Sequence, residues 1–360
     1  MPYDLLTIVV AVYNEADTLP LLQPRIASVL DGLRDEGVDA RILYVDDGSV
    51  DSSWTTLRDI AVHDRRVSLL RLSRNFGKEA ALTAGLDLVD EGAALILDAD
   101  GQDPPELIPQ FVARWREGYD DVYGTRTLRE GEGWMKKSTA HGFYRLIGWL
   151  SKTPIPEDTG DFRLLSPRAL AALRQLRERH RFMKGLFGWI GFRQVSIPYQ
   201  RAARLAGSSK FDFWKLWNFA IEGITSFSTA PLRLATYLGV LTALLAFAYA
   251  LWIVAKALLW GDPVAGWPTM MSVILFLGGV QLIALGMIGE YLGRLYTESK
   301  QRPLYLVDAW LPAPGVSSDE AATERATMPS AQRNAPAQPP AVQEGVDHAH
   351  RTPLARGESA

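Results

Sequence analysis

The chain has 360 residues, a length that allows one domain of ~200 to 250 residues with a sizeable core and a smaller unit beside it. Its formal charge of −3 excludes the overall basic field of a nucleic-acid binder, so recognition of anions must come from local clusters. The absence of cysteine excludes disulfides, thiolate metal sites and a cysteine nucleophile.

The first residues lead directly into an apolar stretch. Tyr3 and Asp4 precede the run 5–12 without a basic region or a small-residue cleavage site, so we expect no signal peptide. The first domain is therefore expected to fold in the cytoplasm.

Short apolar runs alternate with longer helical patterns from Leu5 to about Val122. The runs predict buried strands at 6–11, 41–45, 67–72 and 93–97. The longer patterns predict helices at 19–33, 53–63 and 78–89. This alternation indicates an α/β fold with a doubly wound, mostly parallel sheet, in which ligands bind at the carboxyl ends of the strands.

Two later segments contain no charged residue. Residues 234–255 and 267–289 are uncharged over 22 and 23 positions, and each is long enough at ~1.5 Å per residue to cross ~30 Å of hydrocarbon. We predict a transmembrane hairpin over 231–297, with helices at about 232–258 and 267–292. The alternative is a buried hairpin in a soluble core.

The basic residues around this hairpin predict its orientation. The link 261–266 has no Lys or Arg, whereas Arg233 precedes the first helix and Arg294, Lys300 and Arg302 follow the second. Because cytoplasmic loops carry the excess of Lys and Arg, we expect a multi-pass protein of the cell (inner) membrane whose first domain and both termini are cytoplasmic.

Aromatic and basic residues occur together in two further stretches, 134–150 and 211–227. Such mixtures are typical of helices in the lipid headgroup layer, although amphipathic helices packed on the sheet would have the same sequence pattern. We predict a cytoplasmic domain over 1–210, an interfacial amphipathic helix over 211–230 and a cytoplasmic C-terminal segment over 298–360. The composition of that segment predicts disorder after about residue 311.

The sharpest chemical signal is D-A-D-G-Q at 98–102, directly after a predicted strand. Asp98 and Asp100 cannot both be core residues, because burial of an unpaired carboxylate is costly. Mg²⁺ or Mn²⁺ would compensate their charge, with Gln102 and substrate phosphate oxygens completing the metal shell. A solvated Asp-rich turn is the alternative, since such turns are common.

Two other polar clusters follow predicted strands. Asp46 comes first after the run 41–45 and could accept hydrogen bonds from a nucleobase or ribose, whereas Asp47 or Ser49 could cap the next helix. The cluster at 13–15 follows the first strand, and Tyr13 could stack on the same ligand. Three such strand ends together predict one ligand site.

The motifs in their order resemble the family 2 inverting glycosyltransferases with a GT-A fold. They are T-I-V-V-A-V-Y-N-E (7–15), V-D-D-G-S (45–49), L-S-R-N-F-G-K-E-A-A (72–81) and D-A-D-G-Q-D-P-P-E (98–106). The likeness is closer to the polyprenyl-phosphate branch, which includes dolichyl-phosphate mannose synthases and bactoprenol glucosyltransferases. It continues through D-T-G-D-F-R (158–163), R-H-R-F-M-K-G-L-F (179–187) and R-A-A-R-L-A-G-S-S-K (201–210), and covers roughly residues 5–300.

This resemblance implies a role for each matching residue. The residues expected on the nucleotide are Tyr13, Glu15, Asp46, Asp47, Lys78 and Asp98. Asp98, Asp100 and Gln102 are expected to hold Mg²⁺ or Mn²⁺ with the diphosphate. The metal would neutralise the charge that grows on the departing nucleoside diphosphate.

The acceptor side is predicted from charge. A polyprenyl phosphate is largely ionised near pH 7, since its second pKa is about 6, so it needs positioning more than a base. Its candidate cations are Arg126, Arg129, Lys137, Arg201, Arg204 and Lys210. Asp161 is our first choice to face the anomeric carbon and the acceptor, Asp158 is the second, and Asp100 completes the catalytic set. An acidic turn that holds Arg163 in a structural ion pair is the alternative.

The expected reaction is transfer of a hexose to undecaprenyl phosphate with inversion. The motifs at 74–78 and 158–163 look more like the bactoprenol glucosyltransferases, which implies UDP-glucose, than the enzymes that take GDP-mannose. A processive polysaccharide synthase is a second possibility, but the chain lacks the Q-x-x-R-W motif of such enzymes. A lipid-binding scaffold or flippase would leave Asp46, Asp98 and Asp100 unexplained.

The second apolar segment also carries small residues that favour close helix packing. They are Gly278, Gly279, Gly286, Gly289 and Gly293. We expect these positions to pack within the hairpin or between copies, and we favour a homo-oligomer. The other expected partners are the nucleotide sugar, the polyprenyl phosphate and membrane lipid, with no nucleic acid.

Overall fold

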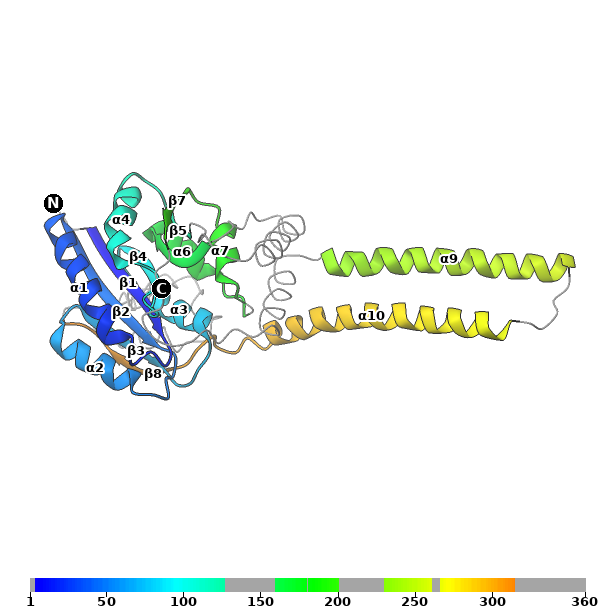
Figure 1. The fold of residues 1–360 in the computed structure, drawn as a ribbon, viewed down its shortest axis with the longest axis horizontal. Helices are drawn as coiled ribbons and strands as arrows, with labels where there is room; N and C mark the ends of the chain where they lie inside the picture. Colours follow the sequence, from blue (N-terminus) through cyan, green and yellow to red (C-terminus); the bar gives the residue numbers. More distant parts are fainter. Residues whose placement is uncertain (1–3, 127–158, 180, 201–229, 261–265, 315–360) are drawn as a thin grey trace, which may run out of the picture.

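A computed structural model of the chain describes residues 4–126, 159–179, 181–200, 230–260 and 266–314 (Figure 1). The strands are β1 (Asp4–Val12), β2 (Val38–Asp46), β3 (Val67–Leu72), β4 (Ala93–Asp98), β5 (Asp121–Arg126), β6 (Thr159–Leu165), β7 (Gln194–Tyr199) and β8 (Val307–Leu311). The helices are α1 (Leu19–Asp35), α2 (Ser53–His63), α3 (Lys78–Asp87), α4 (Ile108–Arg116), α6 (Pro167–Gln175), α7 (Met183–Trp189), α9 (Ala230–Trp260) and α10 (Trp267–Ser299). A 3₁₀ turn at Pro105–Leu107 precedes α4.

The strands form one sheet in the order β7-β5-β6-β4-β1-β2-β3-β8. β4, β1, β2 and β3 are parallel neighbours, as the alternating pattern predicted. β6 is antiparallel to both β4 and β5, and β8 is antiparallel to β3. The start of β6 therefore lies at the same edge of the sheet as the ends of the parallel strands, which is the edge where an α/β sheet binds ligands.

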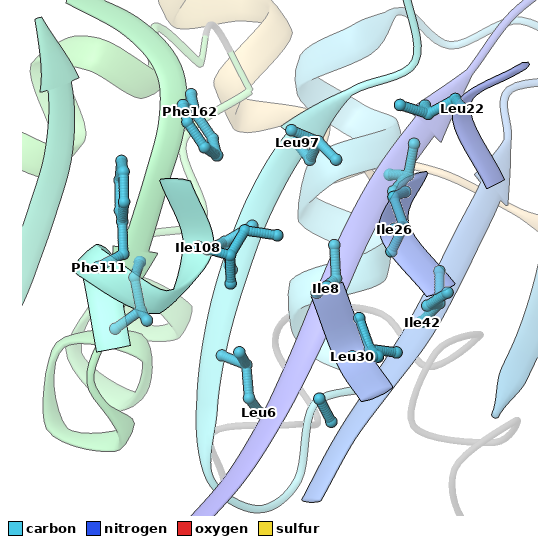
Figure 2. Close-up of a cluster of buried hydrophobic side chains, with 14 of the residues drawn as sticks. Leu6, Ile8, Leu22, Ile26, Leu30, Ile42, Leu97, Ile108, Phe111 and Phe162 are labelled. Carbon is cyan, nitrogen blue, oxygen red and sulfur yellow. The ribbon is translucent and has the colours of Figure 1, made fainter. Parts of the chain in front are cut away.

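Helices cover both faces of the sheet because successive strand residues point to opposite sides. Ile8 packs on one face, where it joins a cluster that includes Ile26 of α1 and Phe111 of α4 (Figure 2). The ring of Phe111 lies 4.6 Å from that of Phe162 in β6, which extends this cluster across the sheet. Val9 points to the other face, where residues of α3, α6 and α7 pack. The expected doubly wound α/β fold is thus confirmed.

Gly85 allows α3 to lie close to the sheet. A Cβ atom at this position would lie 2.4 Å from Cγ1 of Val9 and 2.9 Å from Cγ2 of Val45, and both valines are fully buried. We expect Gly85→Ala to reduce the free energy of unfolding by about 1–3 kcal/mol, the usual cost of overpacking a core. Thermal unfolding of the full chain in detergent measures this as a lower midpoint.

Gly32 provides the matched control for that substitution. It lies in α1, and a Cβ atom there would meet nothing within 4 Å. Because glycine is less favourable than alanine inside a helix, Gly32→Ala should raise the midpoint slightly. Equal midpoints for Gly85→Ala and the wild type would contradict the close packing of α3.

The C-terminal hairpin consists of α9 with 31 residues and α10 with 33 residues, and the two helices contact each other (Figure 1). Within the described residues, one segment is long and apolar enough to cross a membrane, Phe276–Ser299 of α10, and a shorter apolar helix covers Ala235–Tyr249 of α9. The large apolar side chains on both helices are mostly exposed. These exposed surfaces argue against the alternative of a hairpin buried in a soluble core.

The chain after the hairpin returns to the sheet, which the sequence did not predict. β8 extends the sheet beside β3, and the backbone N–H of Ser73 donates to the carbonyl of Leu306 at 2.9 Å. The hydroxyl of Tyr305 donates to Asp87 at the end of α3 at 2.8 Å. The segment that follows α10 is therefore fixed to the domain that carries the ligand-binding edge.

Several predicted segments and residues lie outside the described residues. They are the stretch 134–150, residues 211–229 of the interfacial helix, most of the C-terminal tail, and the residues Arg129, Lys137, Asp158, Arg201, Arg204 and Lys210.

Candidate active site

A cavity of about 570 Å³ opens at the predicted edge of the sheet. Its walls come from the ends of β1 and β4, the start of β6, the start of α3 and the start of α7. The predicted residues that line it are Tyr13, Glu15, Asp47, Lys78, Asp98, Asp100, Arg126 and Asp161. Eight candidates from distant parts of the sequence therefore meet in one place.

The pairing of β4 with β6 explains why two of these carboxylates meet. Ile96 lies opposite Arg163 in an antiparallel register, so continuing this register by two residues sets Asp98 opposite Asp161. Arg163 itself is buried in an ion pair with Asp121, with Nη1 and Oδ2 2.9 Å apart. The acidic motif at 158–163 thus contributes Asp161 to the cavity, while the structural partner of Arg163 is a different aspartate.

Lys78 bridges the two strand ends. Its Nζ atom lies 2.6 Å from Oδ1 of Asp98 and 2.6 Å from Oδ2 of Asp161. The side chain is 43% exposed, and that exposure faces the open cavity. One ammonium group therefore compensates two carboxylates that would otherwise repel each other.

These charges shift the pKa values of the bridge. Burial raises the pKa of Asp161, but Lys78 and then Lys184 outweigh it, and the pKa falls to about 2. Burial lowers the pKa of Lys78, but the negative charges of Asp98 and Asp161 raise it by more, so the net shift of this pKa is upward. Asp161 and Lys78 are thus both charged across the physiological pH range.

Glu79, next to Lys78, has the opposite character. Burial and the negative charge of Asp161 raise its pKa to about 8, against a lowering by Lys78. Its carboxyl accepts a hydrogen bond from the backbone of Met183, which ties α7 to α3. Glu79 is therefore largely protonated at neutral pH.

This raised pKa predicts a pH dependence of stability. The contribution of Glu79 is fully present below its ordinary pKa of 4.5 and is lost as the pH rises through about 8. Glu79→Gln stays neutral at every pH, so the unfolding midpoint of the wild type should fall relative to this variant between pH 5 and pH 9. Thermal unfolding in a pH series measures the difference, and parallel curves would contradict it.

The loop after β1 is fixed against the loop after β2. The backbone N–H of Asn14 donates to Ser49 at 3.0 Å, and that of Glu15 donates to Ser53 at 2.8 Å. Asn14 adopts a left-handed conformation with φ of 54°, which asparagine tolerates better than most residues. This arrangement holds Tyr13, which is 40% exposed, at the rim of the cavity.

The two aspartates after β2 have different surroundings. Asp46 is fully buried, accepts from the backbone N–H of Ser49 at 3.1 Å and lies 3.3 Å from Nε of Arg71. It is not among the described residues that line the cavity. Burial raises its pKa, against the lowering by its bonds to Ser49.

Asp47 shapes the wall between β2 and α3. It accepts hydrogen bonds from the backbone N–H groups of Phe76 and Gly77 at 2.8 and 2.9 Å. The next residue, Gly48, has φ of +65°, and a Cβ atom there would lie 2.4 Å from the carbonyl carbon of Arg74. Asp47 and Gly48 together hold the loop that leads to Lys78.

The predicted metal ligands are partly brought together. Asp98 and Asp100 both line the cavity, whereas Gln102 is used through its backbone N–H, which donates to Asp100 at 3.1 Å. Among the described residues there is no group of three or more His, Cys, Asp or Glu arranged for a metal ion. The donor set nevertheless fits a hard cation that takes part of its shell from a substrate, because two carboxylates, Asp98 and Asp100, line a cavity that is open to a ligand.

Arg126 reaches the cavity from the end of β5. Its Nε lies 3.4 Å from the hydroxyl of Tyr199, and that hydroxyl donates to the buried carboxyl of Asp103. A Cβ atom at residue 160 would lie 2.8 Å from the guanidinium, so Gly160 leaves the room that Arg126 occupies. Burial and the charge of Asp98 raise the pKa of Asp103 to about 6, against the hydrogen bond from Tyr199.

Four ionisable residues at or next to the cavity were not predicted as site residues. They are Glu79, Asp103, Lys184 and Tyr199. Glu79, Asp103 and Lys184 lie inside motifs that carry the resemblance, at 72–81, 98–106 and 179–187, so their position in the sequence offered a signal. Tyr199 lies in no such motif, and no pattern in the sequence indicated its contact with Asp103.

Two family models match this chain. The glycosyl transferase family 2 model matches residues 7–174, and the GtrB C-terminal hairpin model matches residues 230–295. The mixed α/β sheet is typical of the GT-A fold that the resemblance implied. The two-helix hairpin expected from the uncharged segments is likewise a recognised element of such chains.

The chain is also similar to individual proteins, among them one solved structure and two relatives of much higher identity. A mannosyltransferase from Pyrobaculum calidifontis in complex with GDP-Man and Mn²⁺ is 18% identical, with a TM-score of 0.40 over 79% of this chain and 87% of that one. A bactoprenol glucosyl transferase of Shigella phage SfV is 44% identical over 302 residues, 84% of this chain and 97% of that protein. An uncharacterized glycosyltransferase of Synechocystis sp. is 50% identical over 306 residues, 85% of this chain and 95% of that protein. The chain therefore belongs to glycosyltransferase family 2, and its catalytic domain is followed by a GtrB-type C-terminal hairpin.

Proposed function

We propose that this protein transfers a hexose from a nucleotide sugar to a polyprenyl phosphate, with glucose from UDP-glucose as the sugar and undecaprenyl phosphate as the acceptor. The observation that carries the proposal is the meeting of Asp98, Asp100 and Asp161 with Arg126 in one cavity. The relative from Shigella phage SfV supports the choice of sugar and acceptor, because its name is bactoprenol glucosyl transferase and it covers 84% of this chain.

The donor is assigned to the side of the cavity formed by β1 and β4. Tyr13 at the rim offers a ring for the base, and Glu15 offers a carboxylate for the ribose or base. Asp98 and Asp100 would hold Mg²⁺ or Mn²⁺ together with the diphosphate. When bound there, the metal supplies Lewis-acid stabilisation of the charge on the departing nucleoside diphosphate.

The acceptor is assigned to the side formed by β5 and β6. A lipid phosphate oxygen attacks C1 of the sugar, the bond from C1 to the diphosphate oxygen breaks, and the configuration at C1 inverts. Asp161 is ionised through its contact with Lys78, so it provides negative charge beside an oxocarbenium-like centre. The phosphate needs no general base, because its second pKa is about 6.

The hairpin brings this cavity to the lipid. The exposed apolar surfaces of α9 and α10 are suited to the hydrocarbon of a membrane, and we propose that both helices span it with the catalytic domain and both termini on the cytoplasmic side. A homo-oligomer remains part of the proposal, since a Cβ atom added at any of the five glycines of α10 would meet no described atom within 4 Å, which leaves space for a second helix.

A panel of donors tests the proposal. The full chain in membrane vesicles is incubated with undecaprenyl phosphate and with radiolabelled UDP-glucose, UDP-galactose, UDP-N-acetylglucosamine or GDP-mannose. We expect organic-phase label from UDP-glucose to exceed that from each other donor by at least about tenfold, since one or two hydrogen bonds decide sugar choice. Preferential use of GDP-mannose would show that the transferred sugar is mannose and not glucose. If none of the donors yields a labelled lipid, the proposed function is wrong.

A further inference from the structure

Lys184 is a cation at the cavity to which neither the sequence motifs nor the ion pairs assign a role. It is the second residue of α7 and lines the same cavity as Gly160, Asp161 and Arg126. The neighbouring residue Met183 is fully buried, and its backbone is bonded to Glu79 of α3. Lys184 is thus held at the wall of the cavity by a packed element.

The cations of this cavity differ in how their charge is compensated. Lys78 has two carboxylate oxygens at 2.6 Å. Within the described part of the chain, Lys184 has no ion pair or hydrogen bond, and the hydrogen-bond partner of Arg126 is the neutral phenol of Tyr199. Lys184 and Arg126 therefore bring positive charge to the cavity that no directly contacting carboxylate of the described residues balances.

The charges around Lys184 show the same imbalance. Burial lowers the pKa of Lys184, Asp161 raises it, and Arg126, Lys78 and Arg163 lower it. Asp161 is at the same time committed to the bridge with Lys78. An anion placed near Lys184 and Arg126 would offset the cost of burying cations in this region.

Arg126 is positioned for such an anion. The contact with Tyr199, which is bonded to Asp103, fixes one side of the guanidinium. Gly160 lets the guanidinium lie against the start of β6, because a Cβ atom there would be 2.8 Å from Nη2. A guanidinium presents two parallel N–H donors, the geometry that suits a phosphate oxygen pair. An ammonium beside it adds a compact charge and up to three donors.

We propose that Lys184 and Arg126 form a phosphate-binding subsite on the β5–β6 side of the cavity, separate from the carboxylate pair at the end of β4. Its ligand is a phosphoryl group, which both substrates of the proposed reaction carry. The identification of those substrates rests on the proposed function, whereas the subsite itself rests on the two cations.

Two measurements on the full chain in nanodiscs test the subsite and identify the source of the phosphate. The first is the dissociation constant of UDP in the presence of Mn²⁺, by calorimetry. The second is the KM for undecaprenyl phosphate at saturating UDP-glucose. The variants are Lys184→Met, Lys184→Arg and Arg126→Met, with Arg58→Met as the control because Arg58 is an exposed cation on α2.

Loss of one charge-assisted contact should weaken phosphate binding by about tenfold or more. A rise of this size in the KM for the lipid, with UDP binding unchanged, assigns the subsite to the acceptor, and the reverse assigns it to the donor. Lys184→Arg should recover most of the loss because it keeps the charge. Arg58→Met should match the wild type.

The proposal is overturned if Lys184→Met and Arg126→Met keep wild-type values in both measurements while their unfolding midpoints stay normal. If a methionine variant unfolds, Lys184→Arg and Lys184→Gln replace it as the test of the subsite. Wild-type values for the folded Lys184→Gln variant would equally overturn the proposal. If the wild type transfers nothing to undecaprenyl phosphate, the proposed function fails, and the binding of UDP and of inorganic phosphate then decides the subsite alone.

Discussion

Asp161→Asn is expected to lower the rate of sugar transfer by about 100-fold or more, the usual effect of removing a preorganised charge from a reaction centre. Asp161 is partly buried at the start of β6, with its side chain 13% exposed, and its carboxylate contacts Lys78 at 2.6 Å. Asparagine keeps the size of the side chain but removes the negative charge beside C1. The measurement is kcat at saturating donor and acceptor.

Asp39→Asn is the control for this experiment. Asp39 is exposed near the start of β2, at the opposite edge of the sheet, and its neighbour Arg41 lies 3.6 Å away. This variant should keep wild-type activity. Transfer by Asp161→Asn at a rate close to the wild type would remove Asp161 from the reaction centre.

Asp98→Asn is expected to reduce transfer by a similar factor and to raise the concentration of Mn²⁺ needed for half-maximal rate. The carboxylate of Asp98 at the end of β4 carries the charge that a hard cation requires, and an amide oxygen is a weaker ligand for it. Initial rates in a Mn²⁺ titration give both values. Chelation with EDTA should stop the wild-type reaction, and Mg²⁺ or Mn²⁺ should restore it.

The requirement for a metal needs a control at a carboxylate outside the candidate active site. Asp90 is a suitable control, because it lies in the loop after α3, beside a second cavity of about 300 Å³ near the start of β1. Asp90→Asn should leave the Mn²⁺ dependence unchanged. Undiminished lipid product after complete chelation would exclude a divalent metal from the reaction.

The parallel half of the fold could be predicted because its strands are buried on both faces. Such strands are continuous apolar runs, and those of β1 to β4 are separated by helices with regular apolar spacing. The strands β5, β6 and β7 were not predicted. β5 and β6 contain Arg126, Asp161 and Arg163, and charged residues interrupt an apolar pattern even where an ion pair allows their burial.

β8 escaped prediction for a different reason. It has five residues, follows a long helical hairpin and joins the sheet next to β3, which lies more than 200 residues earlier in the chain. A local sequence pattern cannot indicate that two strands so far apart in the chain will pair. Its position makes the segment after α10 part of the same unit as α3, through the bond from Tyr305 to Asp87.

The candidate site was predictable where residues follow strands and less so where tertiary contacts decide their use. Asp98 and Asp100 occupy the expected strand end. Asp47 was expected on the nucleotide, and in the structure its carboxylate accepts two backbone N–H groups of the loop 76–77. A role for Asp47 on the nucleotide remains a prediction. The bridge made by Lys78 depends on the antiparallel entry of β6, which the sequence did not reveal.

The identity of the lipid product decides whether this protein transfers sugar to a lipid phosphate. Purified full chain in nanodiscs is given UDP-glucose, Mn²⁺ and either undecaprenyl phosphate or undecaprenol, which lacks the phosphate. Mass spectrometry of the organic phase should show a hexosyl undecaprenyl phosphate, formed one to one with UDP, from the phosphate alone. A hexosylated undecaprenol, or release of UDP with only free glucose, would contradict transfer to a lipid phosphate.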